Sequence, residues 1–150
     1  METGYELVEY TLKNDGQTVL FISKIGDSSF IEKLAKKKAG REDASRILST
    51  ISRVASRGTK WALESETIKR IKGVSADDVV VFETRNNVGK PIRIATYLHD
   101  NQERTPVFLF PFISHQGADS GIKKSDKEKA VRLAREAKSL MSERDGRNVD

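Results

Sequence analysis

Three strand-like segments follow one another closely in the second half of the chain, and they restrict the fold more than any other feature. VVVFETR (79–85), PIRIATYLH (91–99) and PVFLFPFIS (106–114) are rich in β-branched and aromatic residues. The links between them, NNVGK and DNQERT, are too short for a crossover, so an antiparallel meander is predicted. Pro106 and Pro111 would each remove a ladder hydrogen bond. We therefore expect the last strand to be interrupted or to lie at an edge.

A strand pair and a helical hairpin are predicted before the meander. YELVEYTL and QTVLFISKI are strand-like and flank the turn sequence KNDG. Asp27 or Ser28 can cap the next helix, and Ser29 and Glu32 also have the spacing of a capping box. We expect this helix to end near Gly40. Apolar residues at helical spacing over 44–55 predict a longer helix that stops at Gly58. We expect the next segment, TKWALESETIKRIKG, to be irregular or a short helix.

A final helix is predicted from about Lys124 to Arg144. Its apolar stripe consists of Ala130, Leu133, Ala134, Ala137, Leu140 and Met141. Residues 146–150 are expected to form a frayed tail. The whole pattern predicts one α+β domain over 1–145, with a helical hairpin and a C-terminal helix packed on a mainly antiparallel sheet.

Positive charge is concentrated in the two predicted helical regions. The chain of 150 residues has a formal net charge of +5. Residues 31–61 contain nine Lys or Arg against three Asp or Glu, and residues 123–147 contain nine against five. This distribution is consistent with an acidic partner such as nucleic acid, and equally with solvated helix faces.

Several classes of protein are disfavoured by what the sequence lacks. There is no cysteine, and His99 and His115 are the only histidines, so disulfides, thiol chemistry and a structural zinc site are not expected. No apolar run is long enough for a membrane helix. The N-terminal METGYELVEY does not have the pattern of a secretory signal, so we expect a cytoplasmic protein. No phosphate-binding glycine motif or G-x-S-x-G sequence is present.

Two arginines stand out in the meander. If its first hairpin is symmetric about Gly89, Arg85 lies opposite Arg93. Like charges in such positions repel one another, but two adjacent guanidiniums make a good receptor for a phosphate. The alternative is that Arg85 pairs with Glu83 or Glu103 and that Arg93 faces water.

Strand alternation predicts which residues share a face with Arg93. Ala95, Tyr97 and His99 lie on that face, which we expect to be open, with Lys90 at its rim. The opposite face, with Ile92, Ile94, Leu98, Val80 and Phe82, is expected to pack on helices.

Further candidates come from the loop after the last strand. His115 titrates near neutral pH and follows a strand end, although a loop histidine is more often a surface residue. Lys123 and Lys124 precede the final helix, where the helix dipole disfavours lysine.

The order of these segments resembles the RelE/ParE superfamily of toxins from bacterial toxin–antitoxin pairs, in its HigB-like, phage-derived branch. SSFIEKLAKK resembles the family's first helix, ASRILSTISRVASRG its second, and VVFETR, with Glu83-Thr84-Arg85, its Glu-Leu-Arg strand. KPIRIATYLH resembles its arginine-bearing strand, FLFPFISHQG its aromatic strand and basic loop, and KKSDKEKAVRLAREA its C-terminal helix. The loop SHQGADSG departs from the lysine-rich loop that is usual in the family.

The resemblance implies a RelE-like fold and a toxin of a type II toxin–antitoxin system. Such a toxin is an mRNA endonuclease, often ribosome-dependent, and a cognate antitoxin protein holds it inactive. The substrate's own 2′-hydroxyl attacks the neighbouring phosphate, so neither a metal nor another cofactor is needed.

The resemblance also implies roles for particular residues. Arg85 and Arg93 would bind the scissile phosphate and stabilise the transition state, and His115 would be the general acid or base. Lys90, Lys123 or Lys124 would substitute for His115 if burial lowers a lysine pKa. Tyr97 would stack on a base, or would instead be a buried core aromatic.

Two other functions remain open. The first is a ParE-like toxin that cleaves nothing and inhibits a protein target such as gyrase. The second is a non-enzymatic nucleic-acid-binding module.

Overall fold

The computed structural model describes residues 4–13, 16–64, 68–70, 79–85, 91–102, 104–113 and 124–148. Within these ranges, the side chains at 63, 64, 68–70, 83, 85, 113, 147 and 148 are not described. The described part has one mixed sheet of six strands together with helices. It is an α+β structure, and the predicted fold class is confirmed. None of its helices is both long enough and apolar enough to cross a membrane.

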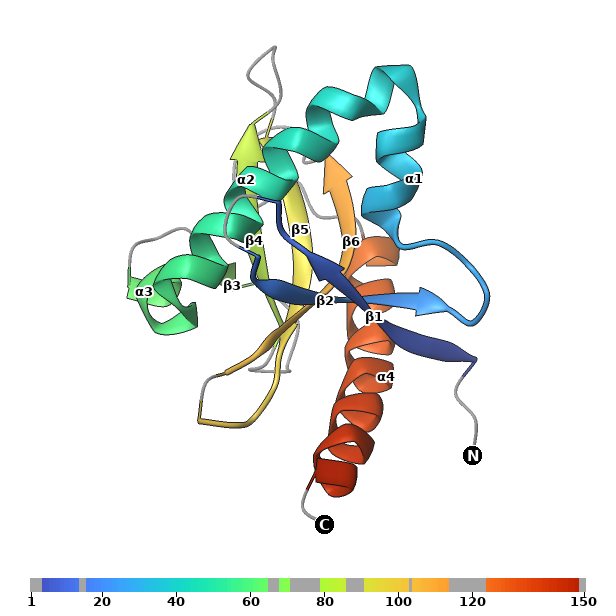
Figure 1. Cartoon of the computed structure of the whole chain (residues 1–150), viewed down its shortest axis with the longest axis vertical. Helices are drawn as coiled ribbons and strands as arrows, with labels where there is room; N and C mark the ends of the chain where they lie inside the picture. The colour runs from blue at the N-terminus through green and yellow to red at the C-terminus, as the bar shows by residue number, and fades with distance from the viewer. Residues whose placement is uncertain are drawn as a thin grey trace.

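The elements follow the predicted order along the chain (Figure 1). The strands are β1 (Tyr5–Thr11), β2 (Thr18–Lys24), β3 (Ile68–Arg70), β4 (Val79–Arg85), β5 (Pro91–Leu98) and β6 (Pro106–Ile113). The helices are α1 (Phe30–Lys36), a 3-10 turn η1 (Lys38–Gly40), α2 (Arg41–Arg57), α3 (Thr59–Glu64) and α4 (Lys124–Asn148). The sequence did not predict β3, and α4 includes positions 146–148, which were expected to fray.

The sheet combines two antiparallel units. Its order is β1-β2-β6-β5-β4-β3, and β4, β5 and β6 form the expected meander. The β1–β2 hairpin joins the meander through β2, which runs parallel to β6 and pairs with it only at Leu20↔Val107 and Phe21↔Phe108. In Figure 1 this hairpin runs across the direction of the meander strands.

The expectation that β6 is interrupted or lies at an edge is wrong, since β6 is continuous and central. Pro106 is its first residue, a position that tolerates proline. β2 pairs with β6 only as far as Phe108. Beyond that residue β6 has no partner on the β2 side among the described strands, so the absent N–H of Pro111 removes no hydrogen bond to β2. The pairing of β6 with β5 contains a β-bulge: Ala95 pairs with Phe110 and Thr96 with Phe108, which leaves Leu109 as the extra residue.

Of the three N-cap candidates, the structure selects Ser29 rather than Asp27 or Ser28, and the hairpin ends at Gly58 as the sequence predicts. Ser29 is the N-cap of α1, and its Oγ accepts a hydrogen bond from the backbone N–H of Glu32 at 3.4 Å. Gly58 ends α2 with φ of 90°, a conformation that suits glycine, and its N–H donates to the Val54 carbonyl at 2.8 Å.

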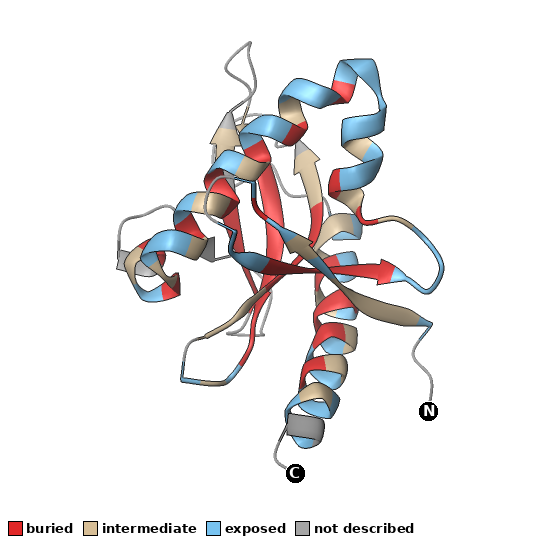
Figure 2. Ribbon diagram, in the orientation of Figure 1, coloured by how far each residue is buried: buried red, intermediate tan, exposed pale blue. Residues whose placement is uncertain are grey.

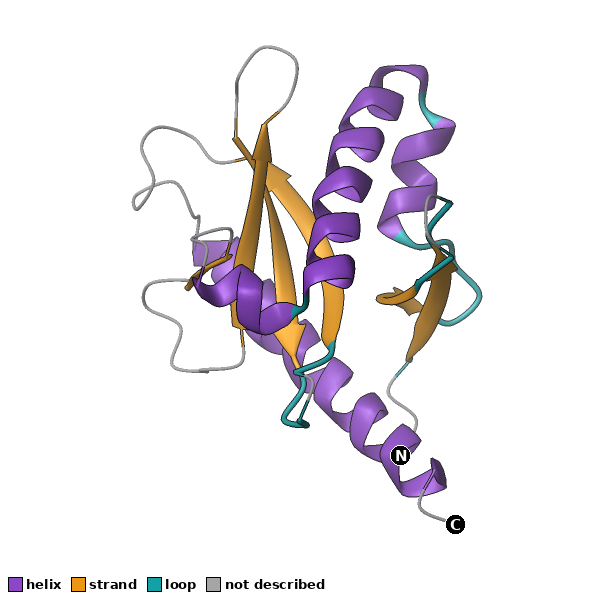
Figure 3. Cartoon of the chain, turned by 60° about the vertical axis from the view of Figure 1, so that its left-hand side comes forward, coloured by secondary structure: helices purple, strands orange, loops and turns teal. Residues whose placement is uncertain are grey.

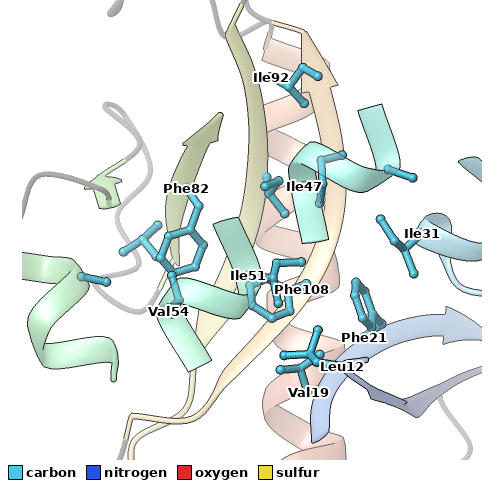
Figure 4. Close-up of a cluster of buried hydrophobic side chains, with 14 of the residues drawn as sticks. Leu12, Val19, Phe21, Ile31, Ile47, Ile51, Val54, Phe82, Ile92 and Phe108 are labelled. Atoms are coloured by element: carbon cyan, nitrogen blue, oxygen red, sulfur yellow. The ribbon is translucent and has the colours of Figure 1, made fainter. Parts of the chain in front are cut away.

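The sheet is the middle layer of three (Figure 3). On one face the α1–α2 hairpin covers a core that includes Phe21, Ile51, Phe82 and Phe108 (Figure 4). On the other face α4 covers a second core, and its buried residues are those of the predicted stripe: Ala130, Leu133, Ala134, Ala137 and Met141, with Leu140 partly buried. Figure 2 shows buried positions along the inner side of both helical layers.

Candidate functional site

The register of the β4–β5 hairpin differs from the expected one. Glu83, not Arg85, is the partner of Arg93, and Arg85 is the partner of Pro91. The ladder is therefore symmetric about position 88 rather than about Gly89, which shifts each partner by two residues. The expected opposition of two arginines is wrong. The observed register sets an acidic residue opposite Arg93, which cross-strand pairing favours over like charges.

The face of β5 that carries Arg93 is not open. Arg93 is 3% exposed, Tyr97 2% and His99 4%. Ala95 and Tyr97 belong to the core under α4. The expectation of an open face is wrong because the apolar stripe of α4 needs an apolar surface, and this face of the sheet supplies it. Tyr97 is a buried core aromatic in this structure, so its ring offers no surface on which a base could stack.

The other expected site residues are only partly described. Lys124 is the first residue of α4 and is exposed. Arg85 ends β4, but its side chain lies outside the described set, as do residues Lys90, His115 and Lys123 entirely. Among the expected site residues with described side chains, Arg93 and Tyr97 lie on the same face of β5, four positions apart and so about 13 Å from each other along the strand.

A chain of three hydrogen-bonding side chains joins β5 to α4. Tyr97 Oη lies 2.9 Å from His99 Nδ1, and His99 Nε2 lies 2.7 Å from Asp145 Oδ2. A neutral imidazole satisfies both contacts if Nε2–H donates to the carboxylate and Nδ1 accepts from the phenol. The His99 side chain is 6% exposed, whereas Asp145 is 50% exposed. This series of hydrogen bonds therefore ends at the surface at Asp145 on α4, and its other end, at Tyr97, is buried in the core.

Asp145 was missed because the sequence analysis ended the apolar stripe at Met141. One further helical step of four residues leads from Met141 to Asp145. A buried histidine at a strand end needs hydrogen-bond partners, and Asp145 is the acidic residue at that step. The spacing was a usable signal, but position 145 lay just beyond the predicted end of the helix at Arg144.

A cavity of about 630 Å³ lies beside these three hydrogen-bonded residues, where the β1–β2 hairpin meets the end of α2. Its polar lining includes Thr59, Thr105 and the ion pair in which Arg144 donates to Glu9 at 3.2 Å. The His99 backbone N–H donates to the Thr105 carbonyl at 2.9 Å, which connects this cavity wall to the buried histidine. The pair between Arg144 and Glu9 fixes α4 against β1.

The exposed face of the helical hairpin is strongly basic, as the sequence predicts. Its exposed cations are Lys33, Lys36, Lys37, Lys38, Arg41, Arg46, Arg53 and Arg57. Some of them have local partners: Lys33 with Asp27 at 2.6 Å, and Arg46 with Glu42 at 3.3 Å. The Arg57 guanidinium lies over the Trp61 ring, 4.8 Å from its centroid. This surface suits contact with a polyanion, and solvated helix faces would look the same.

Among the described residues, no group of three or more His, Cys, Asp or Glu side chains is placed to hold a metal ion. Comparisons of the chain with protein-family models, with curated proteins and with solved structures find no match. The function is therefore argued from the residues and their arrangement.

Proposed function

We propose that this chain is the toxin of a type II toxin–antitoxin system and that it cleaves mRNA without a metal ion. The observation that carries the proposal is the order of the elements: a basic helical hairpin, a three-stranded meander with Arg85 and Arg93 on adjacent strands, and a C-terminal helix. This order agrees with the one that the RelE/ParE resemblance implies. The exposed cations of α1 and α2 support contact with RNA.

In this proposal the protein provides charge and positioning. The 2′-hydroxyl of the RNA attacks the adjacent phosphorus, the bond from phosphorus to the 5′-oxygen breaks, and the products are a 2′,3′-cyclic phosphate and a 5′-hydroxyl. Since Arg93 is 3% exposed, Arg85 is the arginine that we propose contacts the phosphate directly. Arg93 is a buried cation on the neighbouring strand. His115, or one of Lys90, Lys123 and Lys124, would move the protons.

The test is expression in bacteria, followed by cleavage of ribosome-bound mRNA by the purified protein. We expect growth arrest, new 5′ ends on the mRNA, and no cleavage where the attacking nucleotide is 2′-deoxy. Arg85→Ala should lower the cleavage rate by about 10²–10³-fold, the usual effect of removing one transition-state donor. Arg135→Ala is the matched control, since Arg135 is an exposed arginine on α4.

The outcomes separate the three candidate functions. Arrest that persists in Arg85→Ala and in a folded Arg93→Ala variant would contradict the assigned site. Arrest without RNA cleavage would favour a toxin that inhibits a protein target such as gyrase. The thermal unfolding of the Arg93→Ala variant must also be measured, because the Arg93 side chain is buried and its loss could prevent folding.

A non-enzymatic nucleic-acid-binding module is the second candidate, and one observation favours it. Helices cover both faces of the sheet, and exposed cations lie on the α1–α2 hairpin and on α4. A module of this kind would bind RNA in a salt-dependent way, would cleave nothing and would not arrest growth.

A further inference from the structure

A second cavity, of about 380 Å³, lies where β2, α1, β6 and α4 meet. Four cations line it, Lys24, Lys33, Lys129 and Arg132, and among the described residues Asp27 is the one acidic group of the lining. The described lining thus carries four positive charges and one negative charge. None of the residues proposed above for RNA cleavage is among the described residues that line it.

The single carboxylate is already engaged. Asp27 Oδ2 lies 2.6 Å from Lys33 Nζ, and Asp27 Oδ1 accepts a hydrogen bond from the Ser28 backbone N–H at 2.8 Å. The hydrogen bond from Lys33, then the one from Ser28, hold the pKa of Asp27 below its usual value. Asp27 is therefore ionised at neutral pH and compensates Lys33. In the part of the chain that the structure describes, no carboxylate forms an ion pair with Lys24, Lys129 or Arg132.

The other three cations of the lining, Lys24, Lys129 and Arg132, are exposed side chains on β2 and α4, and Asp27 also interacts electrostatically with Lys24. Lys129 Nζ lies over the Phe110 ring, 4.5 Å from its centroid, and Phe110 is 6% exposed. Arg132 is three residues further along the same helix. Lys24 ends β2, where the buried Ser23 hydroxyl lies 3.1 Å from the carbonyl oxygens of both Asp27 and Ser28 and braces the turn. An anion in the cavity would be attracted by all of these positive charges.

The cavity also presents aromatic surface. Tyr5 and Phe30 line it, and both are partly buried. The Phe30 ring is fixed by an edge-to-face contact with Phe21, with centroids 5.1 Å apart. Cations beside aromatic rings suit a ligand that has both phosphate and a planar base. The volume falls within the range of small-ligand sites, roughly 300–1,000 Å³.

We propose that this cavity binds a free nucleotide with at least two phosphates, such as a nucleoside diphosphate. Lys24, Lys129 and Arg132 would contact the phosphates, and Tyr5 would pack against the base. A strand of RNA has one negative charge per nucleotide, whereas the described lining of the cavity places four cations and one carboxylate around one nucleotide-sized space. The concentration of charge therefore favours a polyphosphate over a strand. The site is independent of the RNA cleavage proposed above, because it uses other residues.

The test is isothermal titration calorimetry of the full chain with ADP, AMP and inorganic pyrophosphate. We expect one ADP per chain, with AMP binding at least tenfold more weakly because it lacks a phosphate. Lys129→Ala combined with Arg132→Ala should weaken ADP binding at least tenfold. Arg135→Ala combined with Lys138→Ala is the matched control, since both residues are exposed on α4 and do not line the cavity. Tyr5→Leu should weaken ADP binding but not pyrophosphate binding.

Each contrary result overturns a stated part of the proposal. An absence of ADP and pyrophosphate binding at millimolar concentration would overturn the site, as would an equal loss in the control variant. Pyrophosphate binding as tight as that of ADP would overturn the role of the base. A 2′-O-methyl oligoribonucleotide serves as the probe for an RNA strand. If it binds tightly, if ADP does not displace it, and if the Lys129 and Arg132 changes abolish its binding, the cavity would be assigned to an RNA strand instead of a free nucleotide. None of these measurements depends on RNA cleavage.

Discussion

At the scale of single residues, His99 shows how a polar group is accommodated at the edge of a core. Its ring is buried at the end of β5 and makes one contact to Tyr97 in the core and another to Asp145 near the surface. A buried imidazole without such partners would lose the hydrogen bonds that water provides to the unfolded chain. The contact between His99 and Asp145 also joins the last turns of α4 to the end of β5.

His99→Phe should destabilise the protein by about 1–3 kcal/mol, because it removes both contacts and leaves their partners to find others. Asp145→Asn should cost less than about 1 kcal/mol, because the amide oxygen can still accept from Nε2 and water reaches this end of the chain. Urea unfolding followed by circular dichroism measures both variants. Equal losses would show that the carboxylate charge is needed.

At the scale of the elements, the sequence was enough to predict a feature wherever that feature depends on a single helix or strand. The Gly58 stop and the stripe of α4 each depend on spacing within a single helix, and both are found as predicted, while the capping-box spacing identified Ser29 as one of three candidate caps. The register of β4 and β5 depends on the centre of their loop, which the dipeptide signals around Gly89 did not determine.

Other features depend on how elements pack, and these were missed. The cover over Arg93 and Tyr97 follows from where α4 docks. A signal existed, since two helical layers require two apolar faces of the sheet, and Ala95 and Tyr97 offer the second. Strand β3 has only three residues, too few for an alternation pattern to identify it. Of the expected site residues, Lys90, His115 and Lys123 lie outside the described residues, and so does the side chain of Arg85.

Ser29→Ala should destabilise the protein by about 1 kcal/mol, the usual cost of losing an N-cap side chain. The neighbouring Ser28→Ala is the matched control and should cost less than about 0.5 kcal/mol, as for substitutions away from such features. Thermal unfolding of both variants gives the comparison. A loss in Ser28→Ala as large as in Ser29→Ala would mean that the cap of α1 is assigned to the wrong serine.

At the scale of the whole molecule, Phe21 connects the N-terminal hairpin to the remainder of the protein. It is fully buried, and its ring contacts Tyr10, Phe30 and Phe108 with centroid distances of 6.0, 5.1 and 5.6 Å. These neighbours come from β1, α1 and β6. Because β2 and β6 pair at only two positions, side-chain packing at this junction carries much of the connection.

Phe21→Ala should destabilise the protein by about 3–5 kcal/mol, the usual cost of removing a buried phenylalanine ring. Phe112→Ala is the control, since Phe112 is only partly buried on β6 and should cost less. Urea unfolding with hydrogen exchange would show whether amides in β1 and β2 lose protection first. Equal costs for the two variants, or uniform loss of protection, would contradict a junction that depends on Phe21.

The short parallel junction between β2 and β6 also has a consequence for synthesis on the ribosome. The β1–β2 hairpin is made first, yet its strand partner β6 and its helical partner α4 lie at the other end of the chain. A hairpin of two strands is only marginally stable in water without such partners. Nascent β2 therefore keeps an unpaired edge until β6 has been synthesised, and during that time this edge is exposed to misassociation and to chaperones.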